Sequence, residues 1–248
     1  LILNSIKKSA FFLFKYNESH GIISNHLAGA ALALLKCSIL FKNQLFIEKS
    51  KKIISTLIDL QSNEGWFLEY ESADPGYQTL CTEYLIQISQ IKKIPGLENS
   101  IKKSIKFLSY FIHPDGSFSG EYGSRRTQIY YPGGIASISD KNPLAFSMTK
   151  FMVNSIINEK TVGLNNIDIG NLAPLASSWI QLINSLLKFK KIKNQVILPF
   201  EKKRIFKNFK HAKIIAKSDL KFYTICGIGN GGTLKIFKKD KKELIFDD

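Results

Sequence analysis

The spacing of apolar residues changes once along the chain, near Ile192, and this change constrains the fold more than any other feature. Before it, apolar side chains recur every three or four residues, which is typical of amphipathic helices. After it, short runs of β-branched and aromatic residues alternate with polar turns, which is typical of strands. We therefore predict a mainly α chain in which a helical domain, residues 1–191, is followed by the first strands of a C-terminal β domain at 192–248.

Start signals support several of the predicted helices. Ser24 is a residue type that caps helices, and Pro143 and Pro174 suit a first helical turn. The predicted helices are Ile2–Phe14, Ser24–Phe41, Gln44–Leu60, Tyr77–Ile91, Leu97–Ile112, Pro143–Ile157 and Pro174–Phe189. The predicted strands are Val196–Leu198, Ala212–Ala216, Phe222–Ile225, Thr233–Phe237 and Leu244–Phe246. The glycine-rich run 227–232 lacks the Lys-Ser/Thr pair of a phosphate-binding loop, so we interpret it as a hairpin turn.

The helical part contains an internal repeat. Two amphipathic helices end in a polar turn, then a glycine, then an aromatic residue, once at Gly65 and again at Gly116, 51 residues later. A repeat of this length fits a pair of helices that buries its apolar face only against its neighbours. We expect these helical hairpins to form an incomplete (α/α) toroid. Because the chain begins at Leu1 within a helical pattern and ends at Asp248 just after a predicted strand, we also expect a fragment of a longer protein.

Composition excludes several classes of protein. The 44% of hydrophobic residues is too high for a disordered chain. The cysteines Cys37, Cys81 and Cys226 are odd in number and far apart, so they predict neither a disulfide scaffold nor a metal site. The most apolar stretch, Leu27–Phe41, includes Lys36 and is too short for a clean membrane span. We predict no membrane span, metal or cofactor.

The chain is strongly basic, with 35 Lys+Arg against 20 Asp+Glu and a formal net charge of +15. This charge is accompanied by no zinc-finger spacing, helix-turn-helix pattern or RNA-binding strand motif, so we do not expect a nucleic acid as partner. A positive surface suits any anionic polymer, including an acidic polysaccharide. The oligomeric state is left open.

Three stretches concentrate side chains that can carry chemistry. The first is Asn25-His26, at the start of an apolar helix, where hydrogen-bond donors and the helix dipole favour an anion. The second is the acidic loop 69–77, whose turn at Pro75-Gly76 fixes Tyr77 at a helix start. A tyrosine there can act as a general base or acid. Each stretch also has a purely structural alternative. Asn25 could simply cap its helix, and Tyr77 could simply pack at a helix end beside a solvated acidic loop.

The third stretch is the long, glycine-rich loop 120–134. Long ordered loops in compact domains usually have a function. Arginines can bind carboxylate or sulfate through two parallel hydrogen bonds, and flat aromatic rings suit sugar faces. A structural plug over the mouth of the helical domain is the alternative. The residues of the last two stretches that we assign to substrate binding are Glu69, Glu121, Arg125, Arg126, Tyr130 and Tyr131.

Taken together, the three stretches resemble the heparinase II/III-like polysaccharide lyases. The resemblance rests on the Asn25-His26 pair opening an apolar helix, on the Gly65 turn, and on an acidic loop that ends in Tyr77 about 50 residues after the pair. The loop 115–134 and the β pattern after residue 231 extend it, whereas residues 135–195 match loosely. The order and spacing of the motifs carry the resemblance, because no single motif is diagnostic.

The resemblance implies a helical toroid with a C-terminal β domain and cleavage of acidic polysaccharides by β-elimination, outside the cytoplasm. It assigns neutralisation of the substrate carboxylate to Asn25, assisted by His26, and the base or acid role to Tyr77. These three residues form the predicted catalytic set. The family takes a further catalytic histidine from its β domain. His211 is the only candidate in this chain and comes too early in that domain, so we expect the catalytic histidine to lie beyond Asp248.

Two other functions remain open at this stage. A terpenoid-cyclase or prenyltransferase-like toroid would explain Gln61 with Gly65-Trp66, but the chain lacks that group's aspartate-rich and zinc-binding motifs. A non-catalytic protein that binds glycans or assembles polysaccharides would keep the same toroid and the loop with its arginines and aromatic residues.

Overall fold

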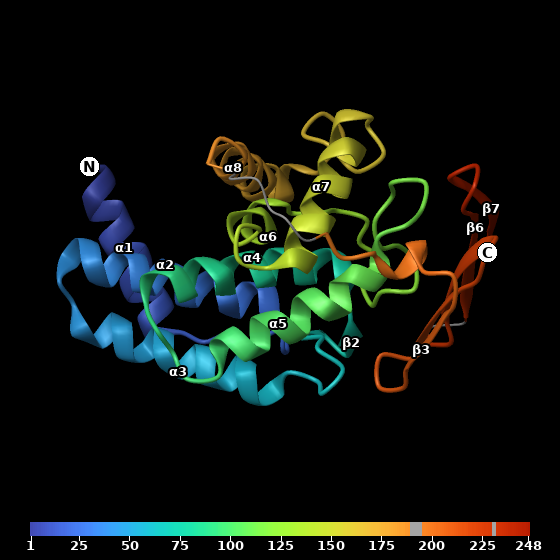
Figure 1. Cartoon of the computed structure of the whole chain (residues 1–248). Helices are drawn as coiled ribbons and strands as arrows, with labels where there is room; N and C mark the ends of the chain where they lie inside the picture. The colour runs from blue at the N-terminus through green and yellow to red at the C-terminus, as the bar shows by residue number, and fades with distance from the viewer. Residues whose placement is uncertain (189–194, 230–231) are drawn as a thin grey trace.

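The computed structural model describes residues 1–188, 195–229 and 232–248. Figure 1 shows the helices filling the N-terminal side of the molecule and an antiparallel sheet at the opposite end, where the chain ends. The helices are α1 (Ile2–Lys15), α2 (Ser24–Phe41), α3 (Gln44–Leu60), α4 (Pro75–Ile91), α5 (Leu97–Leu108), α6 (Gly133–Ser137), α7 (Pro143–Ile157) and α8 (Ile169–Leu186). The strands are β1 (Leu68–Glu69), β2 (Ser72–Ala73), β3 (Ile205–Phe209), β4 (Ile214–Ser218), β5 (Phe222–Gly227), β6 (Thr233–Lys238) and β7 (Glu243–Asp247).

The helices form a two-layer array. Helix α2 packs on α3 and α4, α4 packs on α5 and α6, and α6 packs on α7 and α8. Helices α3, α5 and α7 touch one another in turn, so they form a second layer against the row α2, α4, α6. Helix α1 lies against α2 and α3. The mainly helical class is confirmed, but the described residues do not show closure into a ring.

Most predicted helices are confirmed, with differences at their ends. Helix α4 begins at Pro75 because the Asp74 side chain accepts a hydrogen bond from the Tyr77 N–H and caps it. Helix α8 begins at Ile169, one turn before the predicted start, so Pro174 lies inside it. The predicted end of this helix, Phe189, lies outside the described residues. Helix α5 ends at Leu108 and continues as a short 3₁₀ turn, Ser109–Phe111.

The two glycines of the repeat have the same conformation. Gly65 has φ of 102° and Gly116 has φ of 95°, both in the region that favours glycine. A Cβ at Gly65 would lie 2.4 Å from the carbonyl oxygen of Lys103 on α5. The turn therefore packs directly on the next helical hairpin, and only glycine allows this approach.

The C-terminal sheet is antiparallel, with its strands in the order β3-β4-β5-β6-β7. Pairing of Gly227 with Thr233 confirms the predicted hairpin, although Asn230 and Gly231 of its turn lie outside the described residues. The predicted strand Val196–Leu198 is wrong. The N–H groups of its first and last residues donate to side chains, the Ser147 hydroxyl and the Glu201 carboxylate, rather than to a neighbouring strand.

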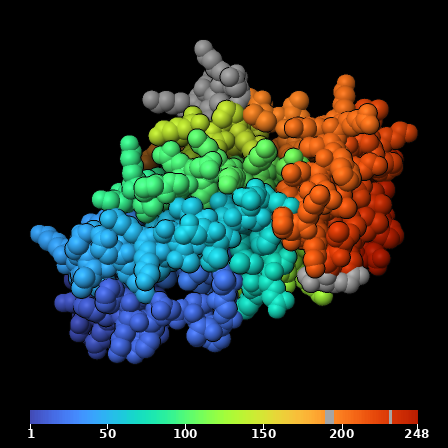
Figure 2. All heavy atoms as spheres, turned by 90° about the horizontal axis from the view of Figure 1, so that it is seen from below, coloured from blue at the N-terminus to red at the C-terminus, as the bar shows by residue number. Residues whose placement is uncertain are grey.

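Helices and sheet share one hydrophobic core. The ring of Phe209 on β3 meets Phe107 edge to face at 4.9 Å, and Phe237 on β6 stacks on His113 at 4.5 Å. Figure 2 shows the strands, in orange and red, packed directly against the cyan segment around residue 65. There the backbone N–H groups of His211 and Ala212 donate to the Glu64 carboxylate. The predicted domain boundary, near residue 191, lies outside the described residues.

Among the described residues, α2 is long and apolar enough to cross a membrane by length and composition alone. Half of this helix is buried inside the protein, and core helices of soluble proteins can have the same length and apolar composition. A single helix of this kind is weak evidence for a membrane span.

Candidate active site

Four of the predicted site residues line one cavity of about 720 Å³. They are Asn25 and His26 on α2, Tyr77 on α4 and Arg125 in the long loop. The cavity is bounded further by α1, by the segment 16–20 and by the first turns of α8. Residues 100 positions apart in the sequence therefore face the same space.

Asn25 is held by a carboxylate that lies behind it. Its backbone N–H and its side-chain Nδ2–H donate to the two oxygens of Glu69, at 3.0 and 2.8 Å. Glu69 has no exposed surface. The positive end of the α2 dipole, predicted to attract a ligand, is therefore occupied by the protein's own carboxylate. Ser24 is the first residue of the helix and makes no side-chain cap.

Glu69 titrates near neutrality. Burial raises its pKa to about 7, although the two hydrogen bonds from Asn25 oppose the shift. The charge of nearby Asp74 raises it further, and the guanidinium of Arg125 lowers it. The ionised carboxylate can accept both Asn25 donors, whereas the neutral acid has only one oxygen free of a proton. The position of the Asn25 amide is thus linked to the protonation of Glu69.

Arg125 lies between two tyrosine rings. The centre of its guanidinium is 4.2 Å from the ring centroid of Tyr77 and 5.2 Å from that of Tyr70. Stacking on aromatic faces leaves the N–H edges of a guanidinium available for a carboxylate. Within residues 1–188, 195–229 and 232–248, the Arg125 side chain makes no ion pair with a carboxylate. The cavity therefore contains a partly buried cation without a counter-ion from the described chain.

One buried carboxylate positions both the tyrosine and the arginine. The Oδ1 atom of Asp74 accepts from the Tyr77 N–H at 3.0 Å, and Oδ2 accepts from the Arg125 N–H at 2.9 Å. Gly76 allows the loop to come this close, because a Cβ there would lie 2.6 Å from Thr127. The turn that the sequence predicted to fix Tyr77 therefore also fixes the loop that carries Arg125.

Asn171 on α8 is a site residue that the sequence did not reveal. Its Nδ2–H donates to the Tyr77 hydroxyl at 3.1 Å and to Asp168 at 2.8 Å, while its Oδ1 accepts from the Tyr131 hydroxyl at 2.8 Å. The carboxylate of Asp168 fixes the orientation of the amide, so the phenol oxygen of Tyr77 accepts this hydrogen bond. Asp168 followed by Asn171 is an N-cap pattern that was concealed when Pro174 was taken as the helix start.

Two histidines at the cavity share one carboxylate, and this was also missed. His26 and His20 donate from Nδ1 to the two oxygens of Glu18, each at 3.0 Å. These contacts lower the pKa of Glu18 to about 2, with the hydrogen bond from His26 as the largest cause. His26 is half exposed, so its Nε2 side remains accessible to a ligand.

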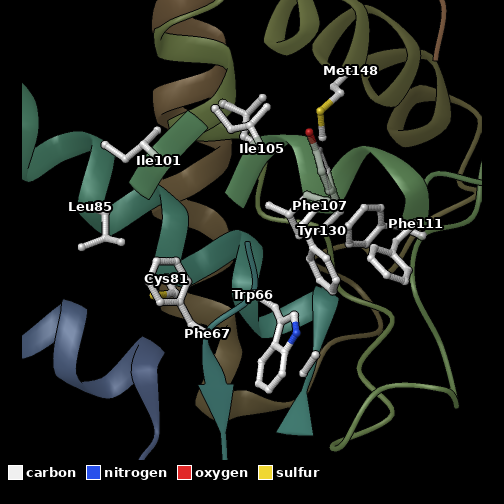
Figure 3. Close-up of a cluster of buried hydrophobic side chains, with 14 of the residues drawn as sticks. Trp66, Phe67, Cys81, Leu85, Ile101, Ile105, Phe107, Phe111, Tyr130 and Met148 are labelled. Carbon is white, nitrogen blue, oxygen red and sulfur yellow. The ribbon is translucent and has the colours of Figure 1, made fainter. Parts of the chain in front are cut away.

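The other predicted substrate-binding residues lie outside the cavity lining. Glu69 is fully buried, and Glu121 pairs with Lys235 at 2.7 Å. Arg126 is exposed on the outer surface of the loop. The rings of Tyr130 and Tyr131 are buried, and Figure 3 shows Tyr130 among core side chains such as Phe107. The expectation that these two tyrosines present faces to a sugar is wrong, because the apolar residues of this loop pack inward.

The remaining histidines do not reach the cavity. His211 lies between β3 and β4 near Glu64. His113 is fully buried between Ser117 and Tyr122, and burial lowers its pKa to about 3, so it stays neutral. In the part of the chain that the structure describes, no group of three or more His, Cys, Asp or Glu side chains could hold a metal ion.

Comparison of the sequence with protein-family models and with curated proteins gave no match.

Proposed function

We propose that this protein is a polysaccharide lyase that cleaves an acidic, uronate-containing polysaccharide by β-elimination. One observation carries the proposal: Asn25, His26, Tyr77 and Arg125 line a single cavity in which the guanidinium has no carboxylate partner among the described residues. An amide, an imidazole, a phenol and a free cation are the groups that binding a carboxylate and moving a proton beside it require.

The reaction begins with the substrate carboxylate. Arg125 and the free N–H of the Asn25 amide bind it, which withdraws negative charge and makes the C5 proton of the uronate more acidic. Tyr77, as phenolate, removes this proton. Asn171 donates a hydrogen bond to the phenol oxygen, and the guanidinium of Arg125 lies over the ring, so both favour the negatively charged form of Tyr77.

Bond changes at the sugar complete the step. The electron pair of the broken C5–H bond forms a C4–C5 double bond, and the bond from C4 to the glycosidic oxygen breaks. This leaving oxygen takes a proton either from Tyr77, which now carries it, or from His26. The products are a new reducing-side hydroxyl and an unsaturated uronate. Tyr77 is one candidate for this acid because it carries the proton taken from C5. His26 is the other, because it is one of the imidazoles that border the cavity among the described residues.

The arrangement of the helices supports the finer prediction of an incomplete (α/α) toroid as part of this proposal. Alternating helices form two rows in contact, as paired helices in a toroid do, and the cavity lies near the starts of α2, α4 and α8. The positions of Arg125, His26 and Glu18 give the cavity charged walls, which disfavours the terpenoid-cyclase alternative.

A non-catalytic glycan-binding protein is the second candidate. It is favoured by the position of His211, which among the described residues lies beside Glu64 rather than at the cavity and so cannot act there as the family's β-domain histidine. Such a protein would use Arg125 and Asn25 to bind an acidic sugar without breaking it.

The two functions are separated by incubating the protein with alginate, chondroitin sulfate and heparan sulfate. A lyase produces a conjugated unsaturated uronate, which absorbs in the near ultraviolet, and Asn25→Ala lowers its rate of formation by about 100-fold. Binding without this absorbance would support the glycan-binding protein. Neither binding nor product with any of the three polymers would contradict both candidates.

A further inference from the structure

The last turn of helix α1 and the residue that follows the helix present two aromatic side chains at the edge of the cavity. Phe12 and Tyr16 are 61% and 53% exposed, and their ring centroids lie 4.9 Å apart with an interplanar angle of 40°. Both residues line the same cavity as Tyr77. They are the exposed aromatic faces of the cavity, in the role that the sequence analysis gave to the buried Tyr130 and Tyr131. We call this pair the α1 platform.

The α1 platform is not needed to attach the helix. Ala10, Leu13 and Phe14 form that attachment, with Phe14 packed 5.9 Å from the ring of Phe46 on α3. Two large rings that contribute little to this contact and remain in solvent are available to a ligand.

Polar and charged groups surround the platform. The Lys15 ammonium lies 5.3 Å from the centroid of the Tyr16 ring, and Asn17, Ser19 and His20 continue the cavity wall beside it. A sugar ring requires this combination, because its C–H face packs on an apolar plane while its hydroxyls need hydrogen-bond partners at the edge. The cation favours an acidic polymer.

We infer that the α1 platform is a second sugar subsite, which binds the ring of a pyranose next to the uronate held by Arg125. The inference rests on the proposed function for the identity of the polymer. A protein partner would be expected to cover the aliphatic side chains nearer the start of α1 as well, such as Leu3 and Ile6. These are exposed but do not line the cavity, whereas the aromatic pair does.

The test uses binding rather than cleavage. Affinities of single uronate sugars and of chondroitin sulfate and alginate hexasaccharides are measured by calorimetry in the Tyr77→Phe background. The double variant Phe12→Ala/Tyr16→Ala is expected to weaken binding of the hexasaccharides about tenfold and to leave binding of the single uronate sugars, which cannot span both subsites, unchanged. Tyr16→Phe, which keeps the ring, should bind the hexasaccharide as the parent does.

Leu3→Ala is the matched control, since Leu3 is 60% exposed on the same helix and lies away from the cavity. Equal weakening by Leu3→Ala, or unchanged hexasaccharide binding in the double variant, would overturn the subsite. Failure of the proposed function is recognised separately, because the wild-type protein would then bind the hexasaccharide without releasing unsaturated product. Circular dichroism confirms that the variants keep the helical fold.

Discussion

The carboxylate of Glu69 holds Asn25 by two hydrogen bonds, one to its backbone N–H and one to its side-chain amide. The two residues are 44 positions apart, and the contact joins the start of α2 to the β1–β2 hairpin. The amide that we propose to bind substrate is therefore oriented by a group that the substrate does not reach. Because Glu69 is buried beside Asn25, its protonation state affects the hydrogen bonds that orient the Asn25 amide.

The raised pKa of Glu69 predicts a pH-dependent contribution to stability. Because the pKa is about 7 in the folded protein against an ordinary value of 4.5, the protonated form is favoured by folding. Its contribution is complete below pH 4.5 and is lost as the pH rises through 7. We expect the free energy of unfolding of the wild type, relative to Glu69→Gln, to fall by about 3 kcal/mol between pH 4.5 and about pH 8.

Urea unfolding of both proteins at the two pH values measures this difference. The subtraction removes the contributions of titrating groups that do not interact with Glu69, such as buried Glu83, whose pKa burial also raises. A difference that stays constant with pH would show that Glu69 keeps an ordinary pKa in the folded protein.

The adjacent arginines provide a matched pair of variants. Arg125 lies in the cavity between Tyr70 and Tyr77, whereas Arg126 is exposed outside it. Lysine keeps the charge but loses the planar, two-pronged contact to a carboxylate. We expect Arg125→Lys to raise KM for a uronate polymer about tenfold and Arg126→Lys to leave it unchanged. Steady-state kinetics on both variants checks this. An equal change of KM in the two variants would show that Arg125 does not bind the substrate carboxylate.

Asn171 is predicted to act through Tyr77. Removal of its hydrogen bond to the phenol oxygen withdraws a donor that stabilises the phenolate, which is the form of Tyr77 that takes the proton. Asn171→Ala should lower kcat about tenfold with little change in KM. Asn184→Ala, an exposed change on the same helix, is the control. A kcat like that of the wild type in Asn171→Ala would show that the contact does not contribute to turnover.

The sequence predicted the regular elements well and the site in part. Apolar periodicity located nearly all helices, because their buried faces repeat along a continuous segment. It missed β3, where lysines flank and interrupt the alternation of Ile205 and Phe209. The order and spacing of the motifs predicted that Asn25 and Tyr77 belong to one site. The burial of Tyr130 and the hydrogen bond from Asn171 could not be predicted, because they depend on how distant segments pack. Residue type alone could not distinguish an aromatic ring in the core from one at the cavity.

The central claim is that the phenol oxygen of Tyr77 moves the proton in a lyase reaction. Tyr77→Phe removes this oxygen and keeps the ring on which Arg125 stacks. The most direct measurement compares the release of unsaturated uronate from alginate, chondroitin sulfate and heparan sulfate by the wild type and by this variant, with polymer binding measured in parallel. We predict that the variant releases no unsaturated product from a polymer that the wild type cleaves, and binds that polymer nearly as well. Product formation by Tyr77→Phe at the wild-type rate would contradict the account.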